Sequence, residues 1–157
     1  MASFDATACA TSDRTTSETT ATTGSYQDIP TGDNNTLPTV TITAPSSGLV
    51  LVLYSAETVE TSSTTAIGHF SPEVDNGDAS DDYAVRRESD SSSTVQTMRS
   101  GAHRLSTVSA ASHTWRLKYK CATADDPTFA NRRITVLGIN AGGGAAFSGL
   151  TVIRPVG

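Results

Sequence analysis

One run of residues restricts the fold of this chain more than any other part of its sequence. From Ser112 to Cys121, successive side chains alternate between two sets without a break. The sets are His113, Trp115, Leu117, Tyr119 and Cys121 on one side of an extended chain and Thr114, Arg116, Lys118 and Lys120 on the other. Because a strand places successive side chains on opposite faces of its sheet, this run predicts a strand with one face in a core.

A second run, Asn131 to Ile139, follows the first after one loop and is rich in β-branched residues. Between the two runs, Asp125-Asp126-Pro127 has the composition of a turn, which predicts a hairpin connection. The two runs are therefore interpreted as the closing strands of an antiparallel sandwich.

Further strands are predicted from short β-rich or alternating segments that are separated by turn residues. They cover residues 3–10 and 18–28 as edge strands, then 39–43, 49–54, 64–70, 83–88, 93–100 and 103–109. The turn Pro45-Ser46-Ser47-Gly48 predicts a hairpin between residues 39–43 and 49–54. The apolar run Leu49 to Tyr54 predicts a strand covered on both faces, either by a neighbouring subunit or by the chain's own loops.

These segments predict an all-β fold, with an antiparallel jelly-roll sandwich of about eight to ten short strands as its topology. The chain has 157 residues, which suits one domain with a real core. We place that domain at residues 1–139, with residues 1–30 as N-terminal edge strands or an arm. Residues 140–157 form a glycine-rich linker and a strand-like arm that could pair with its own sheet edge or with a neighbour's.

The bulk properties exclude several classes of partner. With a net charge of -5, the chain has no general basic surface, so we expect no nucleic-acid partner. The longest apolar run is strand-sized, far below the ~20 residues of a transmembrane helix, and Met1 to Asp5 lacks the features of a secretory signal. We expect a soluble protein made in a cytoplasm, without a membrane partner.

Two cysteines, Cys9 and Cys121, are too few for a disulfide framework or a zinc site. They are interpreted as two small buried or half-buried residues, and a bridge between them stays open. The three histidines, His69, His103 and His113, lie in separate strand-like segments without metal-ligand spacing. Each is interpreted as a half-buried polar residue that a neighbour satisfies.

No catalytic or cofactor motif is complete. Neither Phe147-Ser148-Gly149 nor Arg99-Ser100-Gly101 forms a nucleophile elbow, and Gly142-Gly143-Gly144 lacks the Lys-Ser or Lys-Thr of a phosphate-binding loop. In the acidic loop Asp75 to Asp82, the glycine stands third where an EF-hand requires it sixth, and no closing Glu follows. We expect no catalytic residue, no cofactor and no metal, with calcium at that loop left open.

The basic residues allow more than one interpretation. Arg116, Lys118 and Lys120 form either an anion-binding stripe or a solvated ladder that pairs with acids on an adjacent strand. Arg132 and Arg133 point to opposite faces of their strand. One of them is therefore expected inside the protein or at an interface with its charge paired, for example to Asp5, Asp28 or Glu57.

The whole layout resembles small phage structural proteins that are built on a jelly roll. The matching pieces are Thr16–Thr20 leading to Ser25–Ile29, Pro38–Ile42, Gly48–Val52, Ser112–Tyr119 and Phe129–Val136. They cover most of the span from residue 12 to residue 139, and they match a pattern of strands rather than a catalytic signature. The segment past Ile139 departs from the pattern.

The resemblance implies a trimer-forming sandwich, similar to the tumour-necrosis-factor and complement globular heads. It implies a capsid decoration protein that is made in the host cytoplasm, binds the major capsid protein on the virion surface and stabilises the shell. A chain that starts at Met1 and holds little beyond the domain favours this role over the alternative, a tail-fibre or receptor-binding tip that recognises the host surface. An enzymatic alternative, a glycan hydrolase using Asp81 and Asp82, is disfavoured because adjacent residues on a strand face opposite sides.

The same resemblance assigns two sets of contact residues. The core or subunit interface is expected at Leu49, Leu51, Leu53, Trp115, Leu117 and Tyr119. The contact with the capsid is expected at Phe147, Leu150, Val152, Ile153 and Phe4.

Overall fold

The computed structural model describes residues 4–15, 18–19, 24–28, 37–60, 67–77, 79–88, 96–121 and 127–141. Within these residues the strands are β1 (Phe4–Arg14), β2 (Glu18–Thr19), β3 (Thr39–Thr43), β4 (Leu49–Glu60), β5 (Ile67–Val74), β6 (Val85–Glu88), β7 (Gln96–Thr107), β8 (Ser112–Cys121) and β9 (Thr128–Ala141). One short 3-10 helix, η1 (Asp81–Tyr83), lies between β5 and β6. No helix in this described part of the chain is long and apolar enough to cross a membrane.

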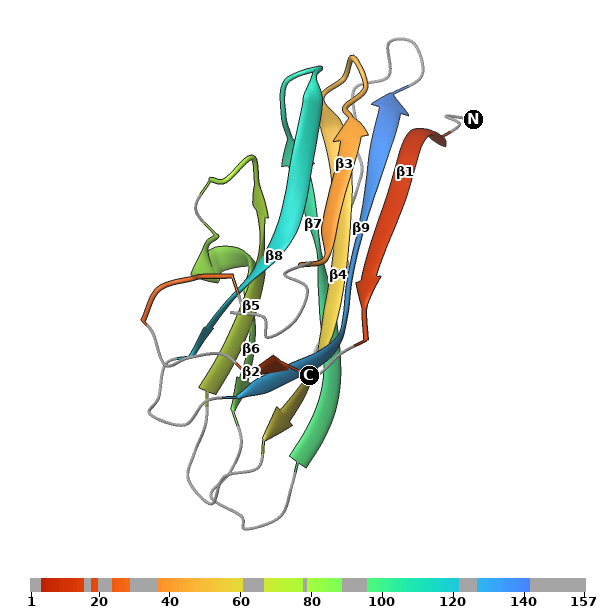
Figure 1. Ribbon diagram of the computed structural model, residues 1–157. Coiled ribbons are helices and arrows are strands. Elements are labelled where there is room, and N and C mark those ends of the chain that lie inside the picture. The colour runs from red at the N-terminus through yellow and green to blue at the C-terminus, as the bar shows by residue number, and fades with distance from the viewer. Residues whose placement is uncertain are drawn as a thin grey trace, which may run out of the picture.

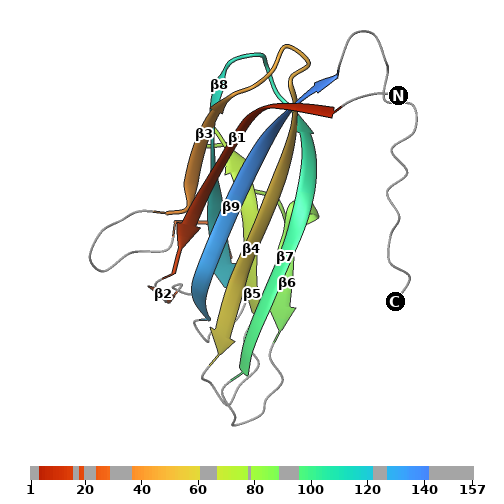
Figure 2. The same ribbon diagram turned by 90° about the vertical axis from the view of Figure 1, so that its right-hand side faces the viewer.

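The strands form two antiparallel sheets that face each other (Figure 1). The larger sheet has the order β1-β9-β4-β7 with β2 beside β9, and the smaller sheet has the order β3-β8-β5-β6. Figure 2 looks onto the larger sheet and shows its four long strands side by side. When β2 is left out, this division of eight strands between two sheets is that of a jelly roll. The predicted all-β jelly-roll sandwich is confirmed.

Both predicted hairpins are wrong. Strand β3 belongs to the smaller sheet and pairs with β8, whereas β4 belongs to the larger sheet and pairs with β7 and β9. Likewise, β8 and β9 lie in different sheets. At the first turn, Gly48 has a φ of 67° and its N–H donates to the carbonyl of Pro45. Turn residues identify where the chain reverses, but in a jelly roll the reversal carries the chain from one sheet to the other.

Several strands differ in extent from the prediction, among them β4, which continues to Glu60 instead of ending at Tyr54. Residues 96–107 form one strand instead of two, because β7 pairs residue for residue with β4 along its whole length. Strand β5 continues through Ser71 and Pro72, where a break was predicted. Proline is tolerated there because β6 pairs with β5 only from Ile67 to Phe70. Strand β9 ends at Ala141, within the segment assigned to the linker.

The N-terminal segment is an edge strand, as predicted. Strand β1 forms the edge of the larger sheet and pairs with β9. In the described part of the strand predicted for residues 18–28, namely residues 18–19 and 24–28, the structure has the two residues of β2 and one isolated bridge. In that bridge Gln27 and Tyr119 exchange backbone hydrogen bonds of 2.9 and 3.0 Å, which attach residues 24–28 to β8.

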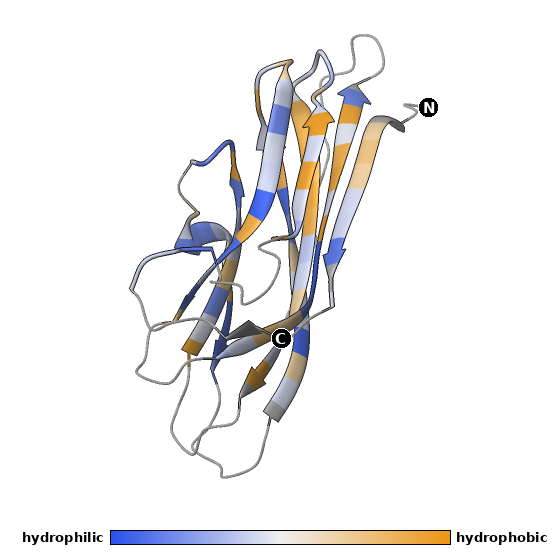
Figure 3. Cartoon of the chain, in the orientation of Figure 1, coloured by the Kyte–Doolittle hydropathy of each residue, from blue (hydrophilic) through white to orange (hydrophobic). Residues whose placement is uncertain are grey.

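The core between the sheets is apolar and aromatic. Its fully buried side chains include Val50, Val52, Phe70, Leu117, Tyr119, Phe129, Ile134 and Val136. Phe129 lies edge-on to Phe70 with ring centroids 6.2 Å apart and lies 5.0 Å from the ring of Tyr119. Aromatic pairs at such spacings add to the free energy gained by burial. Figure 3 shows the hydrophobic colour concentrated on β3, β4 and β9, while η1 is hydrophilic.

One open edge of the sandwich, between β6 and β7, is closed by Tyr83 at the end of η1. The guanidinium of Arg104 lies 3.7 Å from the centre of the Tyr83 ring. The hydroxyl of Tyr54, which burial keeps from ionising by raising its pKa, donates to the carbonyl of Tyr83. These contacts join the two sheets at the edge where β6 is too short to cover β7.

Candidate functional site

Strand β4 has two apolar faces with different surroundings. Val50 and Val52 are fully buried between the sheets. Leu49, Leu51 and Leu53 alternate with them and point away from the smaller sheet, and Leu53 is 41% exposed. The chain itself therefore covers one face of β4 fully and the other only in part.

The residues predicted for the core or subunit interface consequently fall into two groups. Trp115, Leu117 and Tyr119 lie in the core, each 2% exposed or less. The three leucines of β4 lie outside the core. Of the two predicted roles, core residue or subunit contact, only the subunit contact is left for them. The sequence of Leu49 to Tyr54 could not show which face of β4 lies in the core, because both faces of this strand are apolar.

The leucines continue into a row across the larger sheet. Leu51 pairs with Leu105 of β7 on one side and with Leu137 of β9 on the other, and Leu137 pairs with Cys9 of β1. Cys9 and Leu105 are exposed, Leu105 at 47%. We call these four residues the leucine row. Directly opposed residues share one face of a sheet, so the row is a continuous apolar band on the outer face of the larger sheet.

A hollow lies beside the leucine row, over β4 and β7. It has a volume of about 430 Å³, and its lining includes Leu53, Gly101, His103 and Thr135. A Cβ at Gly101 would lie 2.8 Å from the carbonyl oxygen of Tyr54, so the close approach of β4 and β7 at this hollow requires glycine. The outer face is therefore recessed next to its apolar band.

A second hollow shares Ser55 and Arg133 with the first and extends toward β1. It has a volume of about 180 Å³, and Asp13, Arg99, Asn131 and Arg132 also line it. We call it the arginine hollow. A bulge in β9 shapes it, since the pairing with β4 shifts between Ser55 and Glu57 and places an extra residue in β9.

At this bulge Asn131 has a φ of 45°, a left-handed conformation that is uncommon for a residue other than glycine. The Nδ2 of Asn131 donates to Oε2 of Glu57 at 3.1 Å, which holds the bulge against β4. Bulges and strained backbone of this kind occur preferentially where a protein aims side chains for a function.

The two arginines after the bulge have different surroundings. Arg132 is 0% exposed, and its guanidinium lies 5.6 Å from the centre of the Tyr119 ring, which confirms that one of the pair lies inside. Arg133 is exposed, and its Nε and Nη2 donate to the two carboxylate oxygens of Asp13. This paired geometry lowers the pKa of Asp13 and raises that of Arg133. Of the partners suggested from sequence, Glu57 binds Asn131, and the side chain of Asp5 lies outside the described residues.

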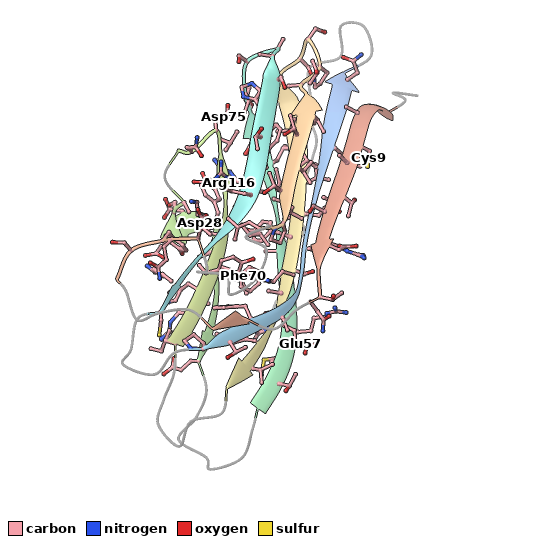
Figure 4. All side chains as sticks on the ribbon, viewed as in Figure 1. Cys9, Asp28, Glu57, Phe70, Asp75 and Arg116 are labelled. Atoms are coloured by element: carbon pink, nitrogen blue, oxygen red, sulfur yellow. The ribbon has the colours of Figure 1, made fainter. Side chains whose placement is uncertain are left out.

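The outer face of the smaller sheet differs, because ion pairs close it. Glu73 of β5 is only 4% exposed although it points away from the core. Its Oε1 lies 2.9 Å from Nε of Arg116 and 3.6 Å from Nζ of Lys118, and Lys118 also lies 2.7 Å from Asp28. Burial raises the pKa of Glu73, and the two neighbouring cations oppose that shift. Figure 4 shows Asp28 and Arg116 on this side of the sandwich, with Phe70 between the sheets.

The next basic residue of the ladder, Lys120, is paired with Asp81 of η1. Its Nζ donates to Oδ2 of Asp81 at 2.6 Å, and the hydroxyl of Tyr26 donates to Oδ1 at 2.7 Å. The bond from Lys120 is the main cause of the lowered pKa of Asp81, while burial is the main cause of the raised pKa of Tyr26. Ser71 also donates to the carbonyl of Ser80, which holds the loop before η1 against β5. Acids therefore pair with all three basic residues of the ladder, but only Glu73 lies on the adjacent strand β5, whereas Asp28 and Asp81 come from residues 24–28 and from η1.

One arrangement that the sequence did not indicate has the order of a catalytic triad. Nδ1 of His113 lies 2.5 Å from Oδ2 of Asp75, and its Nε2 lies 3.0 Å from the hydroxyl of Ser109. However, Nε2 also lies 2.9 Å from the carbonyl oxygen of Ser109, which can only accept a hydrogen bond. The carboxylate of Asp75 and the carbonyl oxygen of Ser109 are both acceptors, and the bond to Asp75 raises the pKa of His113.

A general base needs its Nε2 free to accept from the serine hydroxyl, whereas the Nε2 of His113 also faces the carbonyl oxygen of Ser109, which favours a donor there. Instead, the arrangement ties the loop after β5 to the start of β8. The N–H of Thr114 donates to Oδ1 of Asp75 at 2.8 Å, and this bond is the main cause of the lowered pKa of Asp75. We call Asp75, His113 and Ser109 the histidine clamp.

The acidic loop and the cysteines form no further site in the described residues. Asp75 and Asp81 are engaged by His113 and Lys120, and no group of three His, Cys, Asp or Glu side chains there could hold a metal ion. Cys9 and Cys121 are both free thiols. Cys121 is buried as predicted, but Cys9 is exposed because it lies on the open face of the edge strand β1.

The residues predicted to contact the capsid lie largely beyond the described structure. Phe147, Leu150, Val152 and Ile153 fall in residues 142–157, outside the described part of the chain. Phe4 begins β1 and pairs with Ala141, the last residue of β9. The start of β1 and the point where residues 142–157 begin therefore lie together at one end of the larger sheet.

Comparison with known proteins supplies no family for this chain. No protein-family model matches the sequence, and no curated protein matches it either.

Proposed function

We propose that this chain is a non-enzymatic structural protein of a phage virion, a trimeric decoration protein that binds the outer capsid surface and stabilises the shell. The observation that carries the proposal is the leucine row on the outer face of the larger sheet. The jelly-roll topology and the resemblance to small phage structural proteins support the same role. Because one fold serves many functions, the argument depends on this surface and not on the topology alone.

The leucine row fits a second copy of this chain. An apolar band that crosses four strands is larger than the isolated exposed leucines that most protein surfaces carry. Leu105 in the row and Leu53 beside it are both exposed. The hollow at Gly101 lies next to them and would receive a side chain from a partner. If each copy covers this face of the next, the contact is heterologous and three copies close into a ring.

The capsid contact is assigned to the end of the sandwich where β1 begins and β9 ends. Phe4 lies there, and the segment with Phe147, Leu150, Val152 and Ile153 starts there. In a trimer, three such ends bind the major capsid protein at once. Several weak contacts made by one rigid assembly then give high avidity without a single strong site.

The proposal is tested by mass and by capsid binding. The wild-type protein at micromolar concentration is expected to sediment with three times the mass of one chain and to pellet with capsids. Leu105→Lys should yield a folded monomer, because a charge in the apolar contact is costly to bury. Thr43→Lys, on an exposed position of the smaller sheet, is the matched control and should stay trimeric. A wild-type monomer that fails to bind capsids would overturn the proposal.

A second candidate function is a tail-fibre or receptor-binding tip that recognises the host surface. The arginine hollow favours it, because charged groups gathered in a recess attract a ligand group of opposite charge. Saturable binding of the isolated protein to host cells, without binding to capsids, would select this function over the decoration role.

A further inference from the structure

The arginine hollow differs from the other charged regions of this protein in the balance of its charges. Two exposed arginines, Arg99 and Arg133, line it together with the carboxylate of Asp13, whereas the guanidinium of Arg132 lies in the core near the Tyr119 ring. The chain as a whole carries a net charge of -5, so the hollow is a local region of positive charge on an acidic protein. Positive charge focused in a recess attracts anions more strongly than the same charge on a flat surface.

Nearby acids leave part of this charge unopposed. Asp13 engages the edge of the Arg133 guanidinium that carries Nε and Nη2. Glu57 stands opposite Arg99 in the pairing of β4 with β7 and keeps its negative charge while its Oε2 accepts a hydrogen bond from Asn131, but it forms no ion pair with Arg99. Arg99 is exposed and forms no ion pair with any residue that the structure describes.

The shape of the hollow suits a compact ligand. Its volume of about 180 Å³ is several times the roughly 30 Å³ that one water molecule occupies in the liquid, and much smaller than a drug-sized pocket. The bulge at Asn131 sets the floor, and Ser55 adds a hydroxyl beside the arginines. A guanidinium presents its N–H groups in a planar fork that matches two oxygens of one anion.

We propose that the arginine hollow is a binding site for a small oxyanion, a carboxylate, sulfate or phosphate group, held mainly by Arg99 and Arg133. On β4 the site is lined by Ser55, four positions from Leu51, in the half of the outer face that the leucine row does not occupy. Arginine stays protonated at all ordinary pH values, so sulfate binding is expected to be independent of pH between about 5 and 9.

The experiment follows the arginine Nε–Hε signals of the wild-type protein by NMR at constant ionic strength, with sulfate, inorganic phosphate and acetate as separate titrants. We expect a saturable shift of the Arg99 and Arg133 signals with at least one titrant. Saturation by sulfate or phosphate alone identifies a tetrahedral ligand, and saturation by acetate alone identifies a carboxylate.

Arg99→Gln should weaken that binding about tenfold, as expected when one charge-assisted hydrogen-bonded group is lost, and should leave the melting temperature without ligand unchanged. Arg86→Gln, at an exposed arginine paired with Glu88 on the smaller sheet, is the matched control and should bind as the wild type does. Linear, unsaturated shifts with all three titrants, or equal losses in the two variants, would overturn the proposal.

Discussion

The outer faces of the two sheets invert the usual relation between polarity and burial. On the smaller sheet, Glu73 is 4% exposed, and on the larger sheet Leu105 is 47% exposed. The difference arises because residues 24–28 and the η1 region lie over the smaller sheet and bring acids to its basic ladder. No described segment lies over the leucine row in this way. The chain thus closes its charged face by itself and leaves open the apolar face that the proposed trimer would cover.

The largest effect is expected from opening the closed face. Glu73→Ala leaves Arg116 and Lys118 without their shared carboxylate, and breaking a buried ion pair from one side is strongly destabilising. We expect the free energy of unfolding to fall by about 3 kcal/mol in urea titrations. Glu88→Ala removes an exposed pair with Arg86 and should cost less than about 1 kcal/mol. Equal costs for the two variants would show that the ion pairs of this face are not buried.

A loss of similar size inside the sandwich, and almost none on its open face, is expected from a pair of leucines. Leu117→Ala creates a cavity in the core and should cost about 2 to 5 kcal/mol. Leu105→Ala should change the stability of the monomer by no more than about 0.5 kcal/mol. Urea titrations at concentrations too low for self-association make this comparison. A large loss for Leu105→Ala under those conditions would place that side chain in the fold and not in an interface.

The smallest effect is expected from the histidine clamp and depends on pH. The folded pKa of His113 lies above its ordinary value of 6.5, so the clamp stabilises the fold fully below pH 6.5. This stabilisation is lost as the pH rises through the raised pKa. Since the pKa of Asp75 is lowered from 3.8, its contribution is present above pH 3.8 and lost in acid.

His69 opposes this trend, because burial lowers its pKa and favours the fold at high pH. The effect of the clamp is therefore measured by comparing two proteins. For the wild type and for His113→Gln, the change in unfolding free energy between pH 5.5 and pH 9 is determined, and the two changes are subtracted. We expect the wild type to lose more stability than the variant over this range. Identical pH profiles would mean that His113 is not held as an imidazolium.

The sequence predicted the architecture better than the pairing. The alternation from His113 to Cys121 identified β8 and its buried face, because a period of two has one physical interpretation. The sheet partners could not be predicted in this way, since Pro45 to Gly48 shows a reversal and not the sheet to which the chain returns. The sequence predicted two strands on either side of Gly101, whereas the structure has one strand, β7, which pairs with β4 across this glycine.

The candidate site was predictable only in part. The leucines of β4 were identified as contact residues, but their partners Leu105 and Leu137 emerge only from the register between distant strands. The sequence indicated that one of Arg132 and Arg133 lies inside, and the structure identifies it as Arg132. Neither the arginine hollow nor the histidine clamp could be predicted, because each joins residues from three or more separate segments.

The central claim is that a second copy of the chain covers the leucine row. The most direct test of this claim uses Cys9, the cysteine in that row. Cys9 is exposed in the single chain and Cys121 is buried, so alkylation of the native protein reports on Cys9 with Cys121 as an internal control. We predict that the Cys9 thiol reacts more slowly as the protein concentration rises, and that Leu105→Lys abolishes this protection. A Cys9 alkylation rate that stays the same at every concentration, in a protein that remains folded, would contradict the account.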